Sequence, residues 1–286
     1  MFLVRPLPSK HKRLSRKPRM TIALGMLCSG GALLAADTML VNTDTGAAGE
    51  VQKVRSEQVP WGSFAISNAG DDFYASETLI DNIAQSLRAT SKITGWGLVE
   101  IKISEELAKW SAPHYEVPAT DLIVAAAITG KGVRLYHCQP RNTIQPKLEG
   151  YIAAGVGKEV TDPLQKTLFP ATHSSAMQSP QRILREISYL IYRAKKDNAY
   201  CGKRTNAVYI RDGAAPDWVS GDDLIAAEYH SKALDFLLQM AARFALFSDP
   251  AKLEANANGL GQQLIALAGL RAVVFHNLEG DIIQAP

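Results

Sequence analysis

Three residues near the start of the chain could together activate a hydroxyl group. Asp37 follows Thr21 by 16 residues and Lys53 follows it by 32. A threonine hydroxyl is a poor nucleophile until a base takes its proton, and one solution makes threonine the first residue of a processed chain, so that its own α-amine is the base. A lysine would supply positive charge, and a carboxylate would hold that lysine in place. The spacing therefore predicts a nucleophilic site built on Thr21.

The hydrophobic pattern predicts the elements that position these residues. Strands are expected at 21–28, 31–36, 49–55 (carrying Lys53), 62–68, 121–128, 133–138, 150–154 and 205–211, with a loop over 38–48. Helices are expected at 73–88, 97–110, 159–169, 179–198, 220–247 and 262–269, followed by a strand-like run at 271–276. This order predicts an α+β protein, a four-layer αββα sandwich with a helical C-terminal extension. Strands 21–28 and 121–128 are almost wholly apolar, as expected for strands covered on both faces.

Composition narrows the class of protein. The chain has 286 residues and a net charge of +3, but residues 1–20 hold seven basic groups and no acid. Without them 24 basic residues face 28 acidic ones, a balance of −4, so we expect no nucleic-acid partner. The three cysteines are widely spaced, which argues against a disulfide framework and favours a reducing cytoplasm. Neither they nor the histidines show metal-ligand spacing, and we expect no metal and no cofactor.

A basic stretch followed by the apolar run 21–36 is also typical of a secretory signal peptide. Ser29-Gly30-Gly31 breaks that run, which is too short to cross a membrane as a helix. Leu34-Ala35-Ala36 is a weak match to a cleavage site. We therefore expect no membrane association, and an exported protein with residues 1–36 removed stays open as an alternative.

The stretch from Thr21 to Asp37, TIALGMLCSGGALLAAD, resembles the start of mature proteasome β-type subunits and their bacterial relatives. These are threonine peptidases of the N-terminal-nucleophile (Ntn) hydrolase superfamily. Lys53-Val54 falls where that family has its lysine. Segment 67–70, ending at Gly70, resembles the segment whose glycine N–H faces the reacting carbonyl. Segments 153–157 and 196–202 resemble its glycine–serine–glycine turn and its Asp-x-x-Ser-Gly motif, and the likeness covers residues 21–212.

The resemblance implies an Ntn-type fold and a threonine-type endopeptidase. Thr21 Oγ would attack a peptide carbonyl while the α-amine of Thr21 accepts the proton. Lys53 would favour the alkoxide, Asp37 would fix Lys53, Gly70 would donate its N–H to the oxyanion, and Asp197 would support the site. The substrates would be peptides or unfolded protein, cleaved inside a self-assembled homo-oligomeric ring in the cytoplasm. No feature specifies an ATPase partner.

Departures from the family pattern keep a second interpretation open. Val156 stands where the family has serine between two glycines, and Cys201 stands where it has serine before the last glycine. The spacing from Asp197 to Cys201 is also one residue longer than usual. A catalytically silent structural or binding subunit is therefore the alternative.

The chain is expected to divide into three parts. Residues 1–20 would be a leader or a mis-assigned start, because Met20 directly precedes Thr21 and translation from Met20 would expose it after methionine removal. Residues 21–213 would form the Ntn-type domain. Residues 214–286, rich in alanine and leucine, would form a mainly helical extension.

Overall fold

The computed structural model describes most of the chain. The described residues are 21–41, 47–70, 73–111, 120–139, 142–147, 150–168 and 178–247, with short pieces at 258–259 and 261–262. The helices are α1 (Phe73–Ala89), α2 (Trp96–Ser111), α3 (Lys158–Leu168), α4 (Pro180–Asp197) and α5 (Gly221–Phe247). The strands are β1 (Ile22–Cys28), β2 (Gly31–Asp37), β3 (Met39–Val41), β4 (Ala48–Glu50), β5 (Val54–Val59), β6 (Gly62–Gly70), β7 (Thr120–Ile128), β8 (Gly132–Gln139), β9 (Asn142–Lys147), β10 (Tyr151–Gly155), β11 (Thr205–Arg211) and β12 (Asp217–Trp218).

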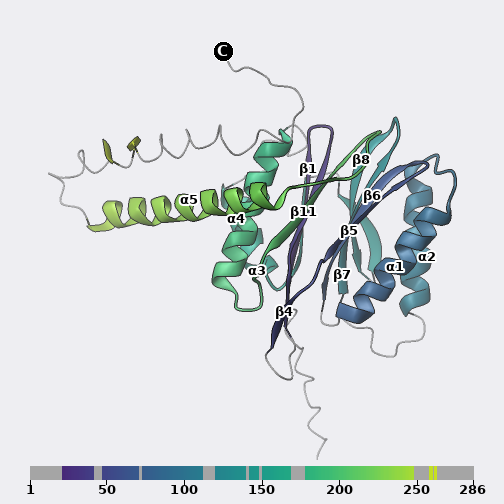
Figure 1. The fold of residues 1–286 in the computed structure, drawn as a ribbon, viewed down its shortest axis with the longest axis horizontal. Helices are drawn as coiled ribbons and strands as arrows, with labels where there is room; N and C mark the ends of the chain where they lie inside the picture. Colours follow the sequence, from purple (N-terminus) through teal and green to yellow (C-terminus); the bar gives the residue numbers. More distant parts are fainter. Residues whose placement is uncertain are drawn as a thin grey trace, which may run out of the picture.

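Two antiparallel sheets of five strands each hold most of these strands. The first sheet has the order β10-β1-β2-β11-β12, and the second has the order β5-β6-β7-β8-β9. In Figure 1, α1 and α2 lie on one side of the strands, and α3 and α4 lie on the other. The structure is therefore a mixed α/β protein with antiparallel sheets, as the strand and helix order predicts.

Three apolar clusters hold these elements together. One joins the second sheet to α1 and α2, and another joins the first sheet to α3 and α4. The third lies between the two sheets and contains many alanines, among them Ala32, Ala65, Ala125 and Ala154. Every residue of β1 and of β7 is buried. This double burial explains why these strands lack the alternation of a half-exposed strand.

Local sequence signals account for several element boundaries. Gly30 has a φ of +73° in the turn between β1 and β2, a conformation that glycine adopts without strain. At the start of α4, the Ser179 hydroxyl accepts a hydrogen bond from the N–H of Arg182 at 3.4 Å, and Pro180 occupies the first helical turn. These signals depend on neighbouring residues alone, and the predicted boundaries at both places agree with the structure to within a residue.

The predictions for the segment around Lys53 were wrong. Lys53 does not lie on a strand: it follows β4 and directly precedes β5. Part of the expected loop 38–48 forms β3, which pairs with β4 in a small sheet of two strands, while β5 joins the second large sheet. The chain thus changes sheets at Lys53, which local patterns do not reveal. The predicted helix 262–269 and strand 271–276 lie almost wholly outside the described residues.

Helix α5, 27 residues long, extends from the body beyond its contact with α4 (Figure 1). Ion pairs fasten the two helices: Arg193 and Lys196 of α4 both bind Asp235 of α5, at 3.1 and 2.5 Å. Among the described helices, none combines the length and apolar character needed to cross a membrane. Residues 217–218, past the expected boundary at 213, still pair with β11 of the first sheet.

Candidate active site

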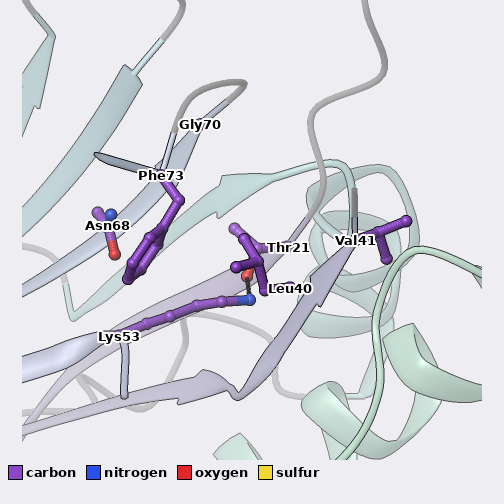
Figure 2. A pocket seen from close by; sticks show the side chains of 7 residues that line it. All are labelled: Thr21, Leu40, Val41, Lys53, Asn68, Gly70 and Phe73. Carbon is purple, nitrogen blue, oxygen red and sulfur yellow. Dashed lines mark hydrogen bonds between the residues drawn. The ribbon is translucent and has the colours of Figure 1, made fainter. Parts of the chain in front are cut away.

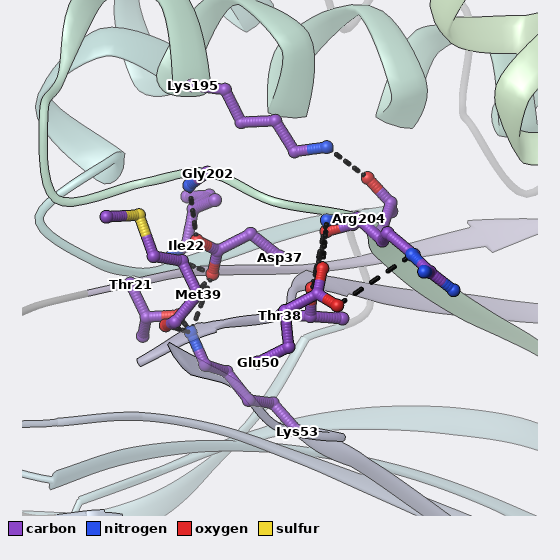
Figure 3. Close-up of polar contacts among 11 residues, drawn as sticks. Thr21, Ile22, Asp37, Thr38, Met39, Glu50, Lys53, Lys195, Gly202 and Arg204 are labelled. Atoms are coloured by element: carbon purple, nitrogen blue, oxygen red, sulfur yellow. Dashed lines mark hydrogen bonds and ion pairs between the residues drawn. The ribbon is translucent and has the colours of Figure 1, made fainter. Parts of the chain in front are cut away.

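The side chains of Thr21, Asp37 and Lys53 meet at the carboxyl end of β2 (Figure 3). The Thr21 hydroxyl donates a hydrogen bond to Asp37 Oδ1 and accepts one from Lys53 Nζ. Lys53 Nζ also donates to Asp37 Oδ1 at 2.9 Å. All three residues are buried. The predicted trio is therefore one connected cluster in which the hydroxyl lies between a carboxylate and an ammonium group.

The carboxylate of Asp37 accepts hydrogen bonds from every other part of the cluster. Besides Thr21 and Lys53, its Oδ1 accepts the backbone N–H of Ile22 at 3.2 Å, and its Oδ2 accepts the backbone N–H of Gly202 at 2.8 Å. Its side chain is fully buried. Hydrogen bonds to a charged carboxylate offset the cost of burying it. This arrangement fixes Asp37 in one position and thereby fixes its contacts with Thr21 and Lys53.

Lys53 reaches the cluster from a different part of the fold than its partners. Thr21 and Asp37 flank β1 and β2 of the first sheet, whereas Lys53 precedes β5 of the second. Its ammonium also donates to the main-chain carbonyl of Met39. Burial lowers the pKa of Lys53 below the usual lysine value, and the charge of Asp37 opposes that shift. The site therefore holds a lysine that gives up its proton more readily than an exposed one.

The turn at Gly155-Val156-Gly157 encloses the main chain of Thr21. The Gly157 N–H donates to the Thr21 carbonyl at 3.4 Å, and Gly155 has a φ of +91°. A β carbon at Gly155 would lie 2.2 Å from the Thr21 oxygen, and one at Gly157 would lie 2.7 Å from Ile22 Cβ. Both glycines are thus required by the close approach of this turn to β1. The side chain of Val156 packs on the cluster facing α4.

A small pocket opens beside the Thr21 hydroxyl (Figure 2). Its lining includes Gly70, the predicted oxyanion donor, so the structure brings Gly70 to the same pocket as Thr21 and Lys53. The pocket is lined by Thr21, Leu40, Val41, Lys53, Asn68, Gly70 and Phe73. A peptide group placed here would meet the hydroxyl on one side and the end of β6 on the other.

The structure does not bring Asp197 to the cluster. Helix α4 continues through Asp197 and places its partly exposed carboxylate against Arg193, at 2.9 Å. Within the 196–202 segment, the contact with the cluster is made by the main-chain N–H of Gly202, which donates to Asp37. Cys201 is buried, and burial raises its pKa to about 12, so its thiol is neutral near pH 7.

Several contacts of the site have no signature in the sequence. The carbonyl of Met39 and the N–H groups of Ile22 and Gly202 act through the main chain, which every residue type offers. Of these three residues, only Gly202 had a signal in the sequence, because it is the last glycine of the segment that resembles the Asp-x-x-Ser-Gly motif. Within the described part of the chain, no three His, Cys, Asp or Glu side chains lie together in a way that could hold a metal ion.

No protein-family model and no curated protein matches the sequence. Solved structures do resemble the fold. Anbu (ancestral beta-subunit) from Yersinia bercovieri has a TM-score of 0.65 and 13% identity, over 80% of this chain and 98% of that one. Anbu from Hyphomicrobium sp. strain MC1 has a TM-score of 0.62 and 15% identity, over 80% and 99%, and its Gly-1 mutant has 0.62 and 16%, over 80% and 98%. The chain thus has a fold similar to that of these Anbu structures.

These comparisons correct the family expected from the first segment. The assignment to proteasome β-type subunits was wrong: the three solved structures named above are Anbu proteins, a distinct family whose fold is close to that of the β-type subunits but separate from it. The stretch from Thr21 to Asp37 spans only the neighbouring strands β1 and β2, a segment too short to separate proteins of similar fold. At 13–16% identity the comparison establishes the fold and leaves the chemistry to the site itself.

Proposed function

We propose that this protein is a threonine-type peptidase of the Ntn kind, whose nucleophile is the Thr21 hydroxyl. The observation that carries the proposal is the contact of that hydroxyl with both Asp37 and Lys53 in a buried cluster beside a pocket. A cation beside the oxygen stabilises an alkoxide, and the carboxylate keeps that cation in place. The four-layer αββα sandwich of Ntn hydrolases is the architecture that we propose for residues 21–213, with 214–286 as an extension.

The proposed reaction is acyl transfer. Thr21 Oγ attacks the carbonyl carbon of a peptide bond in the pocket, and its proton passes to the α-amine of Thr21, directly or through water. The main-chain N–H of Gly70 donates to the oxyanion. The proton on the amine then goes to the leaving amine, which leaves an ester on Thr21, and water hydrolyses that ester. This scheme requires Thr21 to be the first residue of the working chain, because a preceding peptide bond would turn the base into an amide.

Self-assembly is part of the proposal. The neighbour from Yersinia bercovieri is described as an ancestral β-subunit, which supports a multimeric state for a chain of this fold. We propose a homo-oligomeric ring in the cytoplasm that acts on peptides or unfolded protein. The export alternative is disfavoured because the segment 22–36, which it would remove, forms all of the buried strand β1 and all of β2 except Asp37.

The test compares the full chain with a Thr21-exposed protein. In the latter, a factor Xa recognition sequence replaces residues 17–20, the full chain is folded, and factor Xa then cuts before Thr21. These two proteins, and the Thr21→Ala variant of the Thr21-exposed protein, are treated with a peptide epoxyketone. This reagent forms a ring with the hydroxyl and the amine of a single N-terminal threonine. We expect a mass increase on the Thr21-exposed protein and none on its Thr21→Ala variant. Equal labelling of the Thr21-exposed protein and its Thr21→Ala variant, or labelling of neither, would contradict the proposal.

A silent binding subunit is the second candidate, and Val156 and Cys201 favour it. The side chain of Val156 can make no hydrogen bond, and the buried thiol of Cys201 is neutral, so neither replaces the serine expected at its position. The double variant Val156→Ser, Cys201→Ser separates the two functions. Labelling that appears only in this variant would establish that the natural chain is silent, and labelling of the unsubstituted protein would exclude that candidate.

A further inference from the structure

Lys195 is a buried cation that the proposed reaction does not use. It lies on α4, and its side chain is 9% exposed. Its ammonium group donates to Thr205 Oγ1 at 2.9 Å and to Glu228 Oε2 of α5 at 3.3 Å. A half-buried ion pair of this kind adds little to stability, so the position of Lys195 in the fold is the informative feature.

Thr205 connects Lys195 to the site. In the antiparallel pair of β2 and β11, Thr205 stands directly opposite Asp37. Residues paired in this way point to the same face of the sheet, with β carbons roughly 4.5–5.5 Å apart. Ala35 and Ala207, two residues along from this pair, belong to the cluster that faces α4. In Figure 3, Lys195 is above Asp37 and Lys53 is below it.

We infer that Lys195 is a positioning residue of the Thr21 site: from behind Asp37 it holds Thr205 and supplies a second positive charge, and through Glu228 it couples the site to α5. The inference rests on the proposed function, because it concerns the same reaction. Lys195 does not line the pocket and touches none of the reacting atoms.

The titratable groups that face Lys195 come from three directions. Asp37 on β2 lies beneath it, Glu228 and Lys232 face it from α5, and Cys201 lies in the loop after α4. Burial lowers the pKa of Lys195, and the carboxylates of Glu228 and Asp37 oppose that shift. A positive charge here lowers the pKa of the Thr21 amine, which must be neutral to act as a base. Glu228 partly cancels that charge.

The test measures how the rate of epoxyketone labelling of the Thr21-exposed protein depends on pH. Lys195→Met removes a positive charge, so the amine pKa rises and the acidic limb of the profile moves up by about 0.5 pH unit. Glu228→Gln removes the compensating negative charge and moves the limb down. The matched control is Lys196→Met, which also breaks an ion pair between α4 and α5 but lies against Asp235. We expect its profile to be unchanged.

The outcomes are distinguishable. Labelling with identical profiles in Lys195→Met and Lys196→Met would overturn the inference and leave the proposed function standing. Failure of the unsubstituted Thr21-exposed protein to label would remove both. If Lys195→Met does not fold, Lys195→Arg replaces it: a charge role predicts that the arginine variant keeps the original limb, whereas a displaced limb would contradict the inference.

Discussion

Gly155 lies against the main-chain carbonyl of Thr21, so closely that a β carbon at position 155 would stand 2.2 Å from that oxygen. Its φ of +91° is also one that other residues rarely adopt. The turn from β10 into α3 therefore holds the backbone of the residue that carries the reactive hydroxyl.

Gly155→Ala should displace Thr21 and abolish its labelling by the epoxyketone. Gly130→Ala is the matched control, because Gly130 also has a positive φ (+76°) but has open space around its α carbon. The control should lose about 1–2 kcal/mol of unfolding free energy from backbone strain alone. Gly155→Ala should lose more, since strain and a clash act together, as urea unfolding would show. Equal losses and full labelling in both variants would contradict the role given to this turn.

Asp37 and Lys53 should depend on each other strongly. Asp37→Asn leaves the buried ammonium of Lys53 without its counter-charge, and Lys53→Met leaves the buried carboxylate without its cation. Each single change should cost about 3–5 kcal/mol of unfolding free energy. The double variant should cost clearly less than the sum, because it leaves no uncompensated charge. Urea denaturation of the four proteins measures this coupling, and additive costs would show that the pair does not act as a unit.

The buried thiols should make stability fall at alkaline pH. Burial raises the pKa of Cys28 and Cys201 each to about 12, well above the ordinary value of a cysteine thiol. A raised pKa means that the stabilisation is complete below the unfolded pKa and is lost as the pH rises from about 9 toward 12. Lys53, whose pKa is lowered, has the opposite slope in the window just below 10.5.

Cys201→Ser isolates this effect. Between pH 9 and 11 its unfolding free energy should fall less steeply than that of the natural chain, by up to about 1.4 kcal/mol per pH unit. An aromatic disulfide reagent at pH 8 should also modify the cysteines of the natural chain only after unfolding, since all three are buried. Rapid modification of the folded protein would show that these thiols are accessible.

The attachment of α5 should depend on Asp235. This buried carboxylate accepts hydrogen bonds from Arg193, Lys196 and Gln239. Asp235→Asn should lower the unfolding free energy, because it removes the charge of a buried carboxylate to which two cations of α4 donate hydrogen bonds. The exposed pair of Lys102 and Glu105 on α2 offers the control, and Glu105→Gln should leave the melting temperature unchanged. Equal melting temperatures for both variants would count against the buried network.

Local signals predicted most elements of the described fold. The helix expected at 179–198 is α4 at 180–197, because the capping serine and the following proline act on adjacent residues. The buried strands at 22–28 and 120–128 were equally evident, since both are continuous apolar runs. The short strand β9 and the pairing of β3 with β4 were missed because their partners, rather than their own residues, make them strands.

The side chains of the site were more predictable than its main-chain contacts. Thr21, Asp37 and Lys53 were found from residue type and spacing, and the structure brings them together. Asp197 was included because segment 196–202 resembles an Asp-x-x-Ser-Gly motif, but the last turn of α4 directs its carboxylate to Arg193. Lys195 carried no signal, because only the packing of α4 on the first sheet brings it near Asp37.

Lys53 directly precedes a strand of one sheet, whereas Thr21 and Asp37 lie at the ends of strands of the other, and this separation bears on when the site forms. A nascent or half-assembled molecule with only one sheet in place has no cation beside its hydroxyl. If Thr21 cleaves proteins, the chain becomes active only after the two large sheets have packed against each other. Immature copies would then be harmless to the cell that makes them.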